Sequence, residues 1–274
     1  MGCNHDCANC SSNCGSGQIE KLVLNDSSSI KLIIGVLSGK GGVGKSLVTS
    51  LAASRLSNMG YKVGVLDADI TGPSMGKTFG INEKAYQRNN LILPYQTKGG
   101  IKVISTNMLL ENDEDPILWR GSLISSLVSQ FYKDVLWGDL DVLFIDMPPG
   151  TGDVSLTTFQ MIPLDGLVIV TTPQELVSMI VKKSINMAEA MSIPLMGIVE
   201  NMSYVLCPNC DEKIYIYGEN NYNYSYPLLG KIPFDGELTK LVDSGRVEEF
   251  NKDYVDELNK HDLDQCLLNN KNLY

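Results

Sequence analysis

Eight consecutive residues of this sequence have the types and spacing needed to bind phosphate. They are Gly39, Lys40, Gly41, Gly42, Val43, Gly44, Lys45 and Ser46, which fit the pattern G-x-x-x-x-G-K-[ST] at every defined position. The glycines allow backbone N–H groups to converge on phosphate oxygens, and the start of a helix adds the positive end of its dipole. We expect Lys45 to reach the β- and γ-phosphates and the Ser46 hydroxyl to ligate Mg²⁺. The loop and the adjoining Leu47 therefore predict a site for a nucleoside triphosphate, with ATP and Mg²⁺ as the favoured pair.

Three aspartates stand where the carboxylates of such a site belong. Asp67 and Asp69 follow one apolar run, and Asp146 ends another. Carboxylates at the carboxyl ends of parallel strands face the crevice in which a nucleotide binds. Asp146 has the form of a Walker B residue, which holds Mg²⁺, often through a water molecule. The segment 147–153 combines prolines and glycines, as expected of a switch loop that senses the γ-phosphate.

The sequence holds seven cysteines, and six of them lie in two tight groups, as expected of metal or cluster ligands in a reducing compartment. Cys207 and Cys210 form a C-x-x-C pair, which is compatible with a redox couple, a zinc site or an iron–sulfur cluster. Two thiolates leave a metal half-coordinated. A two-fold dimer would complete the set, because two pairs then supply four ligands to one bridging site. Cys266 stands alone in a polar stretch, and we assign it no function.

The second group of cysteines has the spacing C-x3-C-x2-C-x3-C and consists of Cys3, Cys7, Cys10 and Cys14. Four thiolates at such short spacing can wrap one 4Fe–4S cluster or one zinc ion, and we favour the cluster. His5 could replace one thiolate, although a spectator role suits it better.

The elements that must position these residues alternate between short apolar runs and helical patterns. The expected strands cover 31–37, 62–66, 101–105, 142–145, 167–170 and 195–199, and the expected helices cover 45–59, 123–136 and 175–191. Strands that alternate with helices predict a doubly wound, mostly parallel sheet. Here the sheet is expected to be of the P-loop NTPase type, with the nucleotide at the carboxyl ends of the strands.

We divide the chain into a Cys-rich tail, 1–26, and an ATPase domain, 27–274. A polar insertion at about 201–227 carries the Cys pair, and the chain from Asp235 is expected to be helical and polar. The formal net charge of −10 counts against binding to nucleic acid or to anionic lipid. We find no apolar run long enough to span a bilayer and no signal peptide, so we expect a cytoplasmic protein.

Lys40 is a second lysine inside the phosphate loop. The segment GKGGVGKS resembles the loop of the deviant Walker A ATPases, the group of MinD, ParA and the nitrogenase iron protein. Members of that group work as dimers with ATP between the subunits. The resemblance implies that Lys40 contacts ATP in the partner subunit, where it would act like an arginine finger. It also implies that an acid after the second strand polarises the attacking water. We favour Asp69 for that role and place Asp67 near Mg²⁺, although the sequence does not separate the two.

Longer segments resemble a narrower family. DADITGPSM (67–75), WRGSL (119–123), WGDLDVLFIDMPPGTGD (137–153) and ENMSYVLCPNC (200–210) are closely similar to segments of the Mrp/ApbC iron–sulfur carrier ATPases. The resemblance extends from about residue 31 to about residue 245. It implies that Cys207 and Cys210 bind a 4Fe–4S cluster that bridges a homodimer, and that Asn201 lies near the adenine. Zinc remains the alternative occupant. Some scaffold members carry an N-terminal ferredoxin-like cluster, but with a longer first gap between cysteines.

The leading hypothesis is an ATPase with slow hydrolysis that holds a 4Fe–4S cluster and passes it to apo iron–sulfur proteins. The segment 147–153 is then expected to couple the γ-phosphate to the Cys pair. One alternative is a nitrogenase-type reductase that donates electrons under the control of ATP. Another is a MinD- or ParA-like positioning ATPase, which would need a basic amphipathic helix or a basic patch. The acidic residues from Glu248 to Glu257 count against that alternative.

Overall fold

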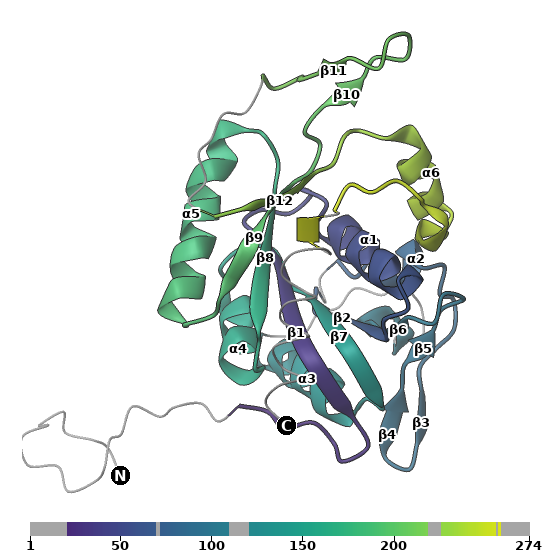
Figure 1. The fold of residues 1–274 in the computed structure, drawn as a ribbon. Helices are drawn as coiled ribbons and strands as arrows, with labels where there is room; N and C mark the ends of the chain where they lie inside the picture. The colour runs from purple at the N-terminus through teal and green to yellow at the C-terminus, as the bar shows by residue number, and fades with distance from the viewer. Residues whose placement is uncertain (1–20, 70–71, 110–120, 219–225, 256, 259–274) are drawn as a thin grey trace, which may run out of the picture.

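The computed structural model describes residues 21–69, 72–109, 121–218, 226–255 and 257–258. Its centre is a sheet of eight strands (Figure 1). In spatial order these strands are β12 (Leu228–Lys231), β9 (Leu195–Glu200), β8 (Gly166–Thr171), β1 (Ser29–Ser38), β7 (Asp139–Asp146), β2 (Val63–Asp67), β6 (Lys102–Ile104) and β5 (Tyr95–Gln96). All neighbouring pairs are parallel except β5 with β6. The predicted doubly wound, mostly parallel sheet is therefore confirmed.

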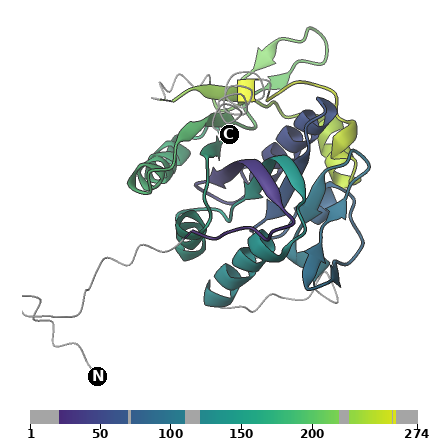
Figure 2. The same cartoon turned by 60° about the horizontal axis from the view of Figure 1, so that its bottom comes forward.

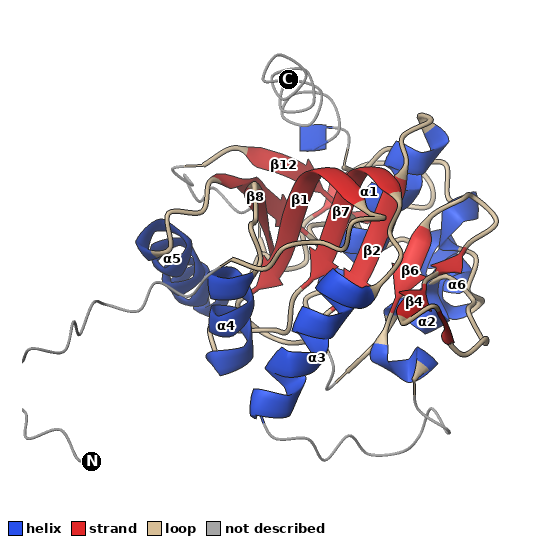
Figure 3. Ribbon diagram, turned by 90° about the horizontal axis from the view of Figure 1, so that it is seen from below, coloured by secondary structure: helices blue, strands red, loops and turns tan. Residues whose placement is uncertain are grey.

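Helices cover both faces of the sheet. They are α1 (Lys45–Asn58), α2 (Met75–Thr78), α3 (Gly121–Asp134), α4 (Asp153–Met161), α5 (Glu175–Ala190) and α6 (Gly236–Asp243), with the 3-10 turns η1 (Thr106–Met108) and η2 (Val247–Glu249). Figure 3 shows α3, α4 and α5 along one face, with α1 on the opposite face. This division follows from the strand order, because right-handed crossovers that move in opposite directions along a sheet lie on opposite faces.

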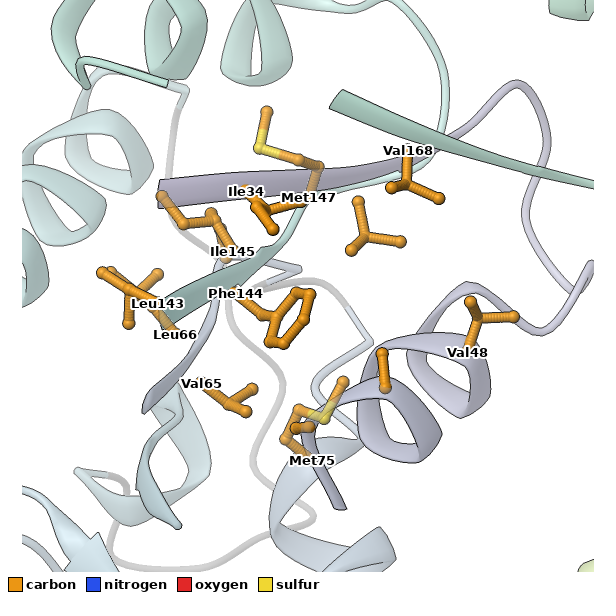
Figure 4. Close-up of a cluster of buried hydrophobic side chains, with 14 of the residues drawn as sticks. Ile34, Val48, Val65, Leu66, Met75, Leu143, Phe144, Ile145, Met147 and Val168 are labelled. Carbon is orange, nitrogen blue, oxygen red and sulfur yellow. The ribbon is translucent and has the colours of Figure 1, made fainter. Parts of the chain in front are cut away.

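The strands in the middle of the sheet are apolar on both faces because both faces are covered. All six residues of β8 and all five of β2 are buried, and both strands are apolar up to their last residues, Thr171 and Asp67, without a polar alternation. In Figure 4, Phe144 of β7 and Val65 of β2 lie on the side of Met75 and Val48. This apolar layer holds α1 and α2 against the sheet and so fixes where the phosphate loop begins.

Two small hairpins stand outside the central sheet. One pairs β3 (Tyr86–Arg88) with β4 (Leu91–Leu93), and the other pairs β10 (Val205–Leu206) with β11 (Lys213–Ile214). The second hairpin projects beyond the carboxyl end of β9 (Figures 1 and 2). We call it the Cys hairpin, because Cys207 and Cys210 lie in its connecting turn.

The expected strands and helices from residue 31 to residue 199 are all present, with shifts of a few residues at their ends. The helix expected from about Asp235 is present as α6, but it ends at Asp243, and residues 250–254 are not helical. Residues 259–274 of that stretch lie outside the described residues. Helix α4 begins at Asp153, the last residue of the 147–153 segment, and the sequence did not predict it.

Residues 21–26, which the sequence assigned to the tail, contact the domain in the structure. The Lys21 ammonium donates to the backbone carbonyls of Phe159 and Ile162 at the end of α4. How the chain divides into tail and domain stays a prediction. Among the helices described, none combines the length and the apolar character needed to cross a bilayer.

Candidate functional site

The phosphate loop and the expected carboxylates meet at the carboxyl edge of the sheet. Strand β7 lies between β1 and β2, and Asp146 at its end is in register with Val36 of β1 and Asp67 of β2. The phosphate loop continues directly from β1 into α1. Three segments that are far apart in the sequence therefore converge because their strands are neighbours.

The conformation of the phosphate loop depends on glycine at its last turn. Gly44 precedes α1 with φ of 86°, in the left-handed region. A Cβ atom at this position would lie 2.0 Å from the side-chain nitrogen of Asn201. That nitrogen donates to the carbonyl of Val43 at 2.9 Å. Asn201, which follows β9, thus forms a wall of the phosphate loop.

Lys45 and Ser46 converge on Asp146. The Lys45 ammonium lies 2.7 Å from Asp146 Oδ2, and the Ser46 hydroxyl donates to the same oxygen at 2.6 Å. The other oxygen, Oδ1, accepts a hydrogen bond of 2.8 Å from Thr49, which lies one turn further along α1. Asp146 is completely buried, so these partners both satisfy and orient its carboxylate.

Asp67 is also completely buried, and its carboxylate accepts hydrogen bonds from the segment that follows β2. Its oxygens accept hydrogen bonds from the backbone N–H groups of Asp69, Ser74 and Met75, at 3.1 to 3.2 Å. The Ser105 hydroxyl adds a fourth hydrogen bond of 3.0 Å. Asp67 therefore anchors the chain between β2 and α2.

The two aspartates after β2 differ in their environment. Burial, followed by repulsion from Asp146, raises the pKa of Asp67 to about 7, although Lys45 and the hydrogen-bond donors oppose the rise. Asp69 is 13% exposed, and its Oδ2 lies 3.7 Å from the Lys45 ammonium. Asp69 is thus the more accessible of the two carboxylates that the sequence could not separate.

Lys40 and the 147–153 segment lie on the outer side of the phosphate loop. The side chain of Lys40 is exposed, while its carbonyl accepts a hydrogen bond from the Ser38 hydroxyl at 3.0 Å. Gly150 donates its backbone N–H to the Ser38 carbonyl at 2.7 Å. The 147–153 segment therefore contacts the end of β1, where the phosphate loop begins. Its role as a sensor of the γ-phosphate stays a prediction.

A hollow of about 190 Å³ opens beside the phosphate loop, between the end of β9 and α6. Its lining consists of Leu47, Asn201, Met202, Pro233, Phe234, Asp235, Leu238, Thr239, Val242 and Asp243. The Phe234 ring is partly exposed and offers an apolar platform. Its position beside the phosphate loop suits the base of a nucleotide whose phosphates occupy the loop.

Sequence reasoning missed several residues of this region. Thr49 could have been found, because it lies three residues after Ser46 and therefore on the same side of the helix. Ser105 and Phe234 carried no local signal. They reach the site only through the order of the strands and the path of the chain after β12.

The Cys pair lies in the turn of the Cys hairpin, apart from the phosphate loop along the chain. Both thiols are free, Cys207 half-buried and Cys210 exposed. The turn is closed by hydrogen bonds from the N–H of Cys207 to the Glu212 carbonyl, 2.9 Å, and from the N–H of Asp211 to the Cys207 carbonyl, 3.0 Å. The backbone N–H of Asn209, followed by the thiol and N–H of Cys210, donates to the Cys207 sulfur and lowers the pKa of that thiol.

The pair supplies two ligands, and the described residues around it do not complete a metal site. Within the described ranges, no group of three or more His, Cys, Asp and Glu side chains is arranged to hold a metal ion. The N-terminal cysteines 3, 7, 10 and 14, with His5, lie outside the described residues, as does Cys266.

Comparison with known proteins connects these features. The family whose profile matches residues 29–264 is described as NUBPL iron-transfer P-loop NTPase. An iron-sulfur cluster carrier protein of Clostridium perfringens is 46% identical over 91% of this chain and 95% of its own length. A protein of the same name from Methanocaldococcus jannaschii is 44% identical over 89% of each chain.

Solved structures agree on the fold. A nucleotide-binding protein of Archaeoglobus fulgidus, in complex with ADP, superposes with a TM-score of 0.74 and 44% identity, and the match covers 82% of this chain and 90% of that one. The cell division ATPase MinD of Pyrococcus furiosus has a TM-score of 0.58 at 18% identity over 89% of this chain and all of its own, which shows the fold alone. The resemblance found in the sequence is thus confirmed, and this chain belongs to the family of NUBPL iron-transfer P-loop NTPases.

Proposed function

We propose that this protein binds ATP with Mg²⁺, hydrolyses it slowly, and carries a 4Fe–4S cluster that it delivers to apo iron–sulfur proteins. The observation that carries the proposal is the presence, in one chain, of a complete phosphate loop and a Cys hairpin, with Asn201 between β9 and the hairpin bonded to the loop. The names of the relatives from C. perfringens and M. jannaschii support the cargo, and the ADP complex of the A. fulgidus neighbour supports the nucleotide.

In this proposal each residue of the nucleotide site has a separate task. The phosphate loop binds the triphosphate, Lys45 neutralises it, and the hollow beside Asn201 takes the base. Ser46 and Asp146 fit Mg²⁺, since a hydroxyl and a carboxylate stand 2.6 Å apart at the loop. The ion would supply positive charge to the phosphates. Asp69 orients the attacking water, because Asp67 is occupied by backbone N–H groups. Exposed Lys40 reaches the ATP of a partner subunit.

The cluster belongs between two copies of the chain. A 4Fe–4S cluster takes four thiolates, and the described part of each chain offers two at the Cys hairpin. Two-fold symmetry brings two pairs together without further ligands. Zinc is the competing occupant, since it accepts the same four thiolates. Free, clustered thiols suit a reducing compartment, and we therefore place the carrier in the cytoplasm.

Anaerobic reconstitution of the full chain with iron and sulfide tests the proposal. The double variant Cys207→Ala/Cys210→Ala should lose about two iron atoms per chain, half of one bridging cluster, and should lose the dimer that forms on reconstitution. The matched control is Cys266→Ala, which should keep both. Iron content and oligomeric state that do not change in the double variant would rule out the bridging site. Zinc retained under iron and sulfide would rule out the cluster.

A further inference from the structure

Glu200 is a buried carboxylate for which the chemistry at the phosphate loop has no use. It is the last residue of β9, directly before Asn201, and only 1% of it is exposed. Its Oε1 accepts a hydrogen bond of 2.6 Å from the Ser203 hydroxyl and lies 3.9 Å from the ammonium of Lys231 on β12. A carboxylate is costly to bury unless it is paired and hydrogen-bonded, so Glu200 depends on Ser203 and Lys231 for its place in the fold.

Lys231 connects this carboxylate to the Cys hairpin. Its ammonium lies 5.9 Å from the centre of the Tyr215 ring, within the range of a cation–π contact. Tyr215 directly follows β11, and its ring packs at 6.0 Å against that of Tyr204, directly before β10. The two rings therefore lie at the open end of the Cys hairpin, away from its turn, where the hairpin joins the domain. Lys213 of β11 adds a second cation 4.7 Å from the Tyr204 ring.

The backbone at the base of the hairpin is tied to the strand that leads into the nucleotide hollow. Ser203 donates its N–H to the carbonyl of Ile232, and Phe234 donates to the carbonyl of Tyr204, both at 2.9 Å. Phe234 and Asn201 line the hollow. One short piece of backbone thus contacts the nucleotide site on one side and supports the hairpin on the other.

The same segment contacts the phosphate loop through Asn201. Asn201 donates to the Val43 carbonyl from its side chain, and its own N–H donates to Thr171 of β8 at 2.8 Å. A Cβ at Gly44 would lie 2.0 Å from the same side-chain nitrogen, so Asn201 packs closely against the phosphate loop. Asn201 is followed after six positions by Cys207.

We infer that Glu200 and Lys231 are positioning residues that couple the nucleotide site to the Cys pair. Together with Ser203, Tyr204 and Tyr215 they form what we call the hairpin clamp. A ligand in the hollow fixes Asn201 and Phe234, the clamp transmits that constraint to the base of the hairpin, and the exposure of Cys207 and Cys210 changes. The inference rests on the proposed function for its purpose, which is to let nucleotide control when the thiolates hold cargo. Its physical content is a coupling between two sites and needs no cluster.

Thiol labelling of the full-length, reduced and metal-free chain measures this coupling directly. Iodoacetamide is applied in short pulses with and without MgADP, and mass spectrometry of peptides resolves Cys207 and Cys210 from the other cysteines. MgADP should change the labelling rate of the pair by about fivefold or more, the range typical of coupled sites. Lys231→Met and Tyr215→Ala should each reduce that response to less than about twofold while the Kd for ADP stays within about threefold of wild type. Lys231→Arg keeps the cation and should retain the response.

Two controls protect the interpretation. Lys31→Met removes the lysine of a different ion pair, in which the Lys31 ammonium lies 2.7 Å from Asp141 Oδ1. This pair lies near the amino ends of β1 and β7, far from the hairpin along the strands, so the variant should keep the labelling response. Tyr215→Ala removes a ring of the hairpin and keeps the contacts of the buried Glu200 with Lys231 and Ser203. It therefore tests the coupling even if Lys231→Met does not fold.

The coupling is overturned if MgADP leaves the labelling of the wild-type pair unchanged, or if the full response persists in both Lys231→Met and Tyr215→Ala. The iron count of the reconstituted wild type is independent of these rates. A chain that takes up the cluster but shows no response to nucleotide refutes the clamp alone. A chain that responds to nucleotide but binds no iron refutes the proposed cargo and leaves the clamp standing.

Discussion

Asp67 lies at the end of β2 without exposure to solvent, and this burial determines the pH at which its carboxyl group ionises. Its pKa is raised to about 7 from an ordinary value of 3.8, by burial first and by the neighbouring Asp146 second. Between these two values the folded chain holds a proton that the unfolded chain releases. The contribution of Asp67 to stability is therefore full below pH of about 4 and is lost as the pH rises to about 7.

The first prediction concerns this pH dependence in the absence of nucleotide. Relative to Asp67→Asn, the wild type should lose melting temperature steadily as the pH rises from about 4 to about 7, and the two curves should run parallel above that range. Thermal unfolding followed by circular dichroism at a series of pH values measures the difference. Parallel curves across the whole range would contradict a raised pKa at Asp67.

Asp235→Asn is a suitable control for this experiment. Burial acts to raise the pKa of Asp235, but hydrogen bonds from Lys252 and Tyr254 outweigh it and lower the value to about 2. The stability that Asp235 contributes is lost only as the pH falls below about 4 toward 2. Its substitution should lower the melting temperature by a constant amount across the range in which Asp67 titrates.

At the scale of elements, the junction between the phosphate loop and α1 depends on two separate properties of Gly44. Its positive φ disfavours any side chain, at about 1–2 kcal/mol, and Asn201 fills the space that a Cβ would need. Gly60, after the end of α1, shares only the first property, since its φ is 91° and nothing lies within 4 Å of a Cβ placed there.

These two glycines allow strain to be separated from collision. Gly60→Ala should lower the free energy of unfolding by about 1–2 kcal/mol and leave ADP affinity unchanged. Gly44→Ala should in addition displace Asn201 and weaken ADP binding by at least about tenfold, or about 1.4 kcal/mol. Calorimetric titration with ADP, together with urea unfolding, measures both quantities. Equal ADP affinity in the two variants would show that Asn201 is not a wall of the nucleotide site.

The hairpin elements illustrate how much local sequence can leave open. The turn between β3 and β4 contains Asn89 and Asn90, both with positive φ, a conformation that asparagine tolerates. The two flanking strands are only three residues long, too short for a clear alternation of polar and apolar side chains. The strands of the Cys hairpin have only two residues each, and their pairing became visible only in the folded chain.

At the scale of the whole molecule, the proposed dimer predicts that Lys40 acts on the ATP of the partner subunit. Lys40→Ala and Lys45→Ala homodimers should each lack ATP hydrolysis. In an equimolar mixture half of the dimers combine one chain of each kind, and one of their two sites then has Lys45 in place and receives Lys40 from the other chain. The mixture should recover about a quarter of wild-type activity.

Phosphate release from the mixed chains measures this recovery. Mixing each variant with itself at the same total concentration gives the baseline. A mixture that stays at the baseline, although the chains are shown to exchange subunits, would mean that Lys40 acts within its own chain or not at all.

Several properties of this protein were determined by its sequence alone. The phosphate loop, the apolar strands that flank it and the Cys pair are local patterns, since each depends on neighbouring residues and their backbone preferences. The same is true of Asp146 at the end of an apolar run. Such patterns predicted the class of sheet, and the resemblance that rests on them agrees with the family shown by comparison.

Only the tertiary structure decided which side chains meet. Thr49 reaches Asp146 across 97 positions of the chain, Ser105 reaches Asp67 across 38, and Asn201 reaches Val43 across 158. These contacts follow from the order β9-β8-β1-β7-β2-β6, which no local pattern encodes. The pairing of Glu200 with Lys231 is of the same kind, because β9 and β12 are neighbours in the sheet although 27 residues separate them in the chain. Burial strengthens the hydrogen bonds of these polar groups and raises the pKa of Asp67, and burial is a property of the folded chain.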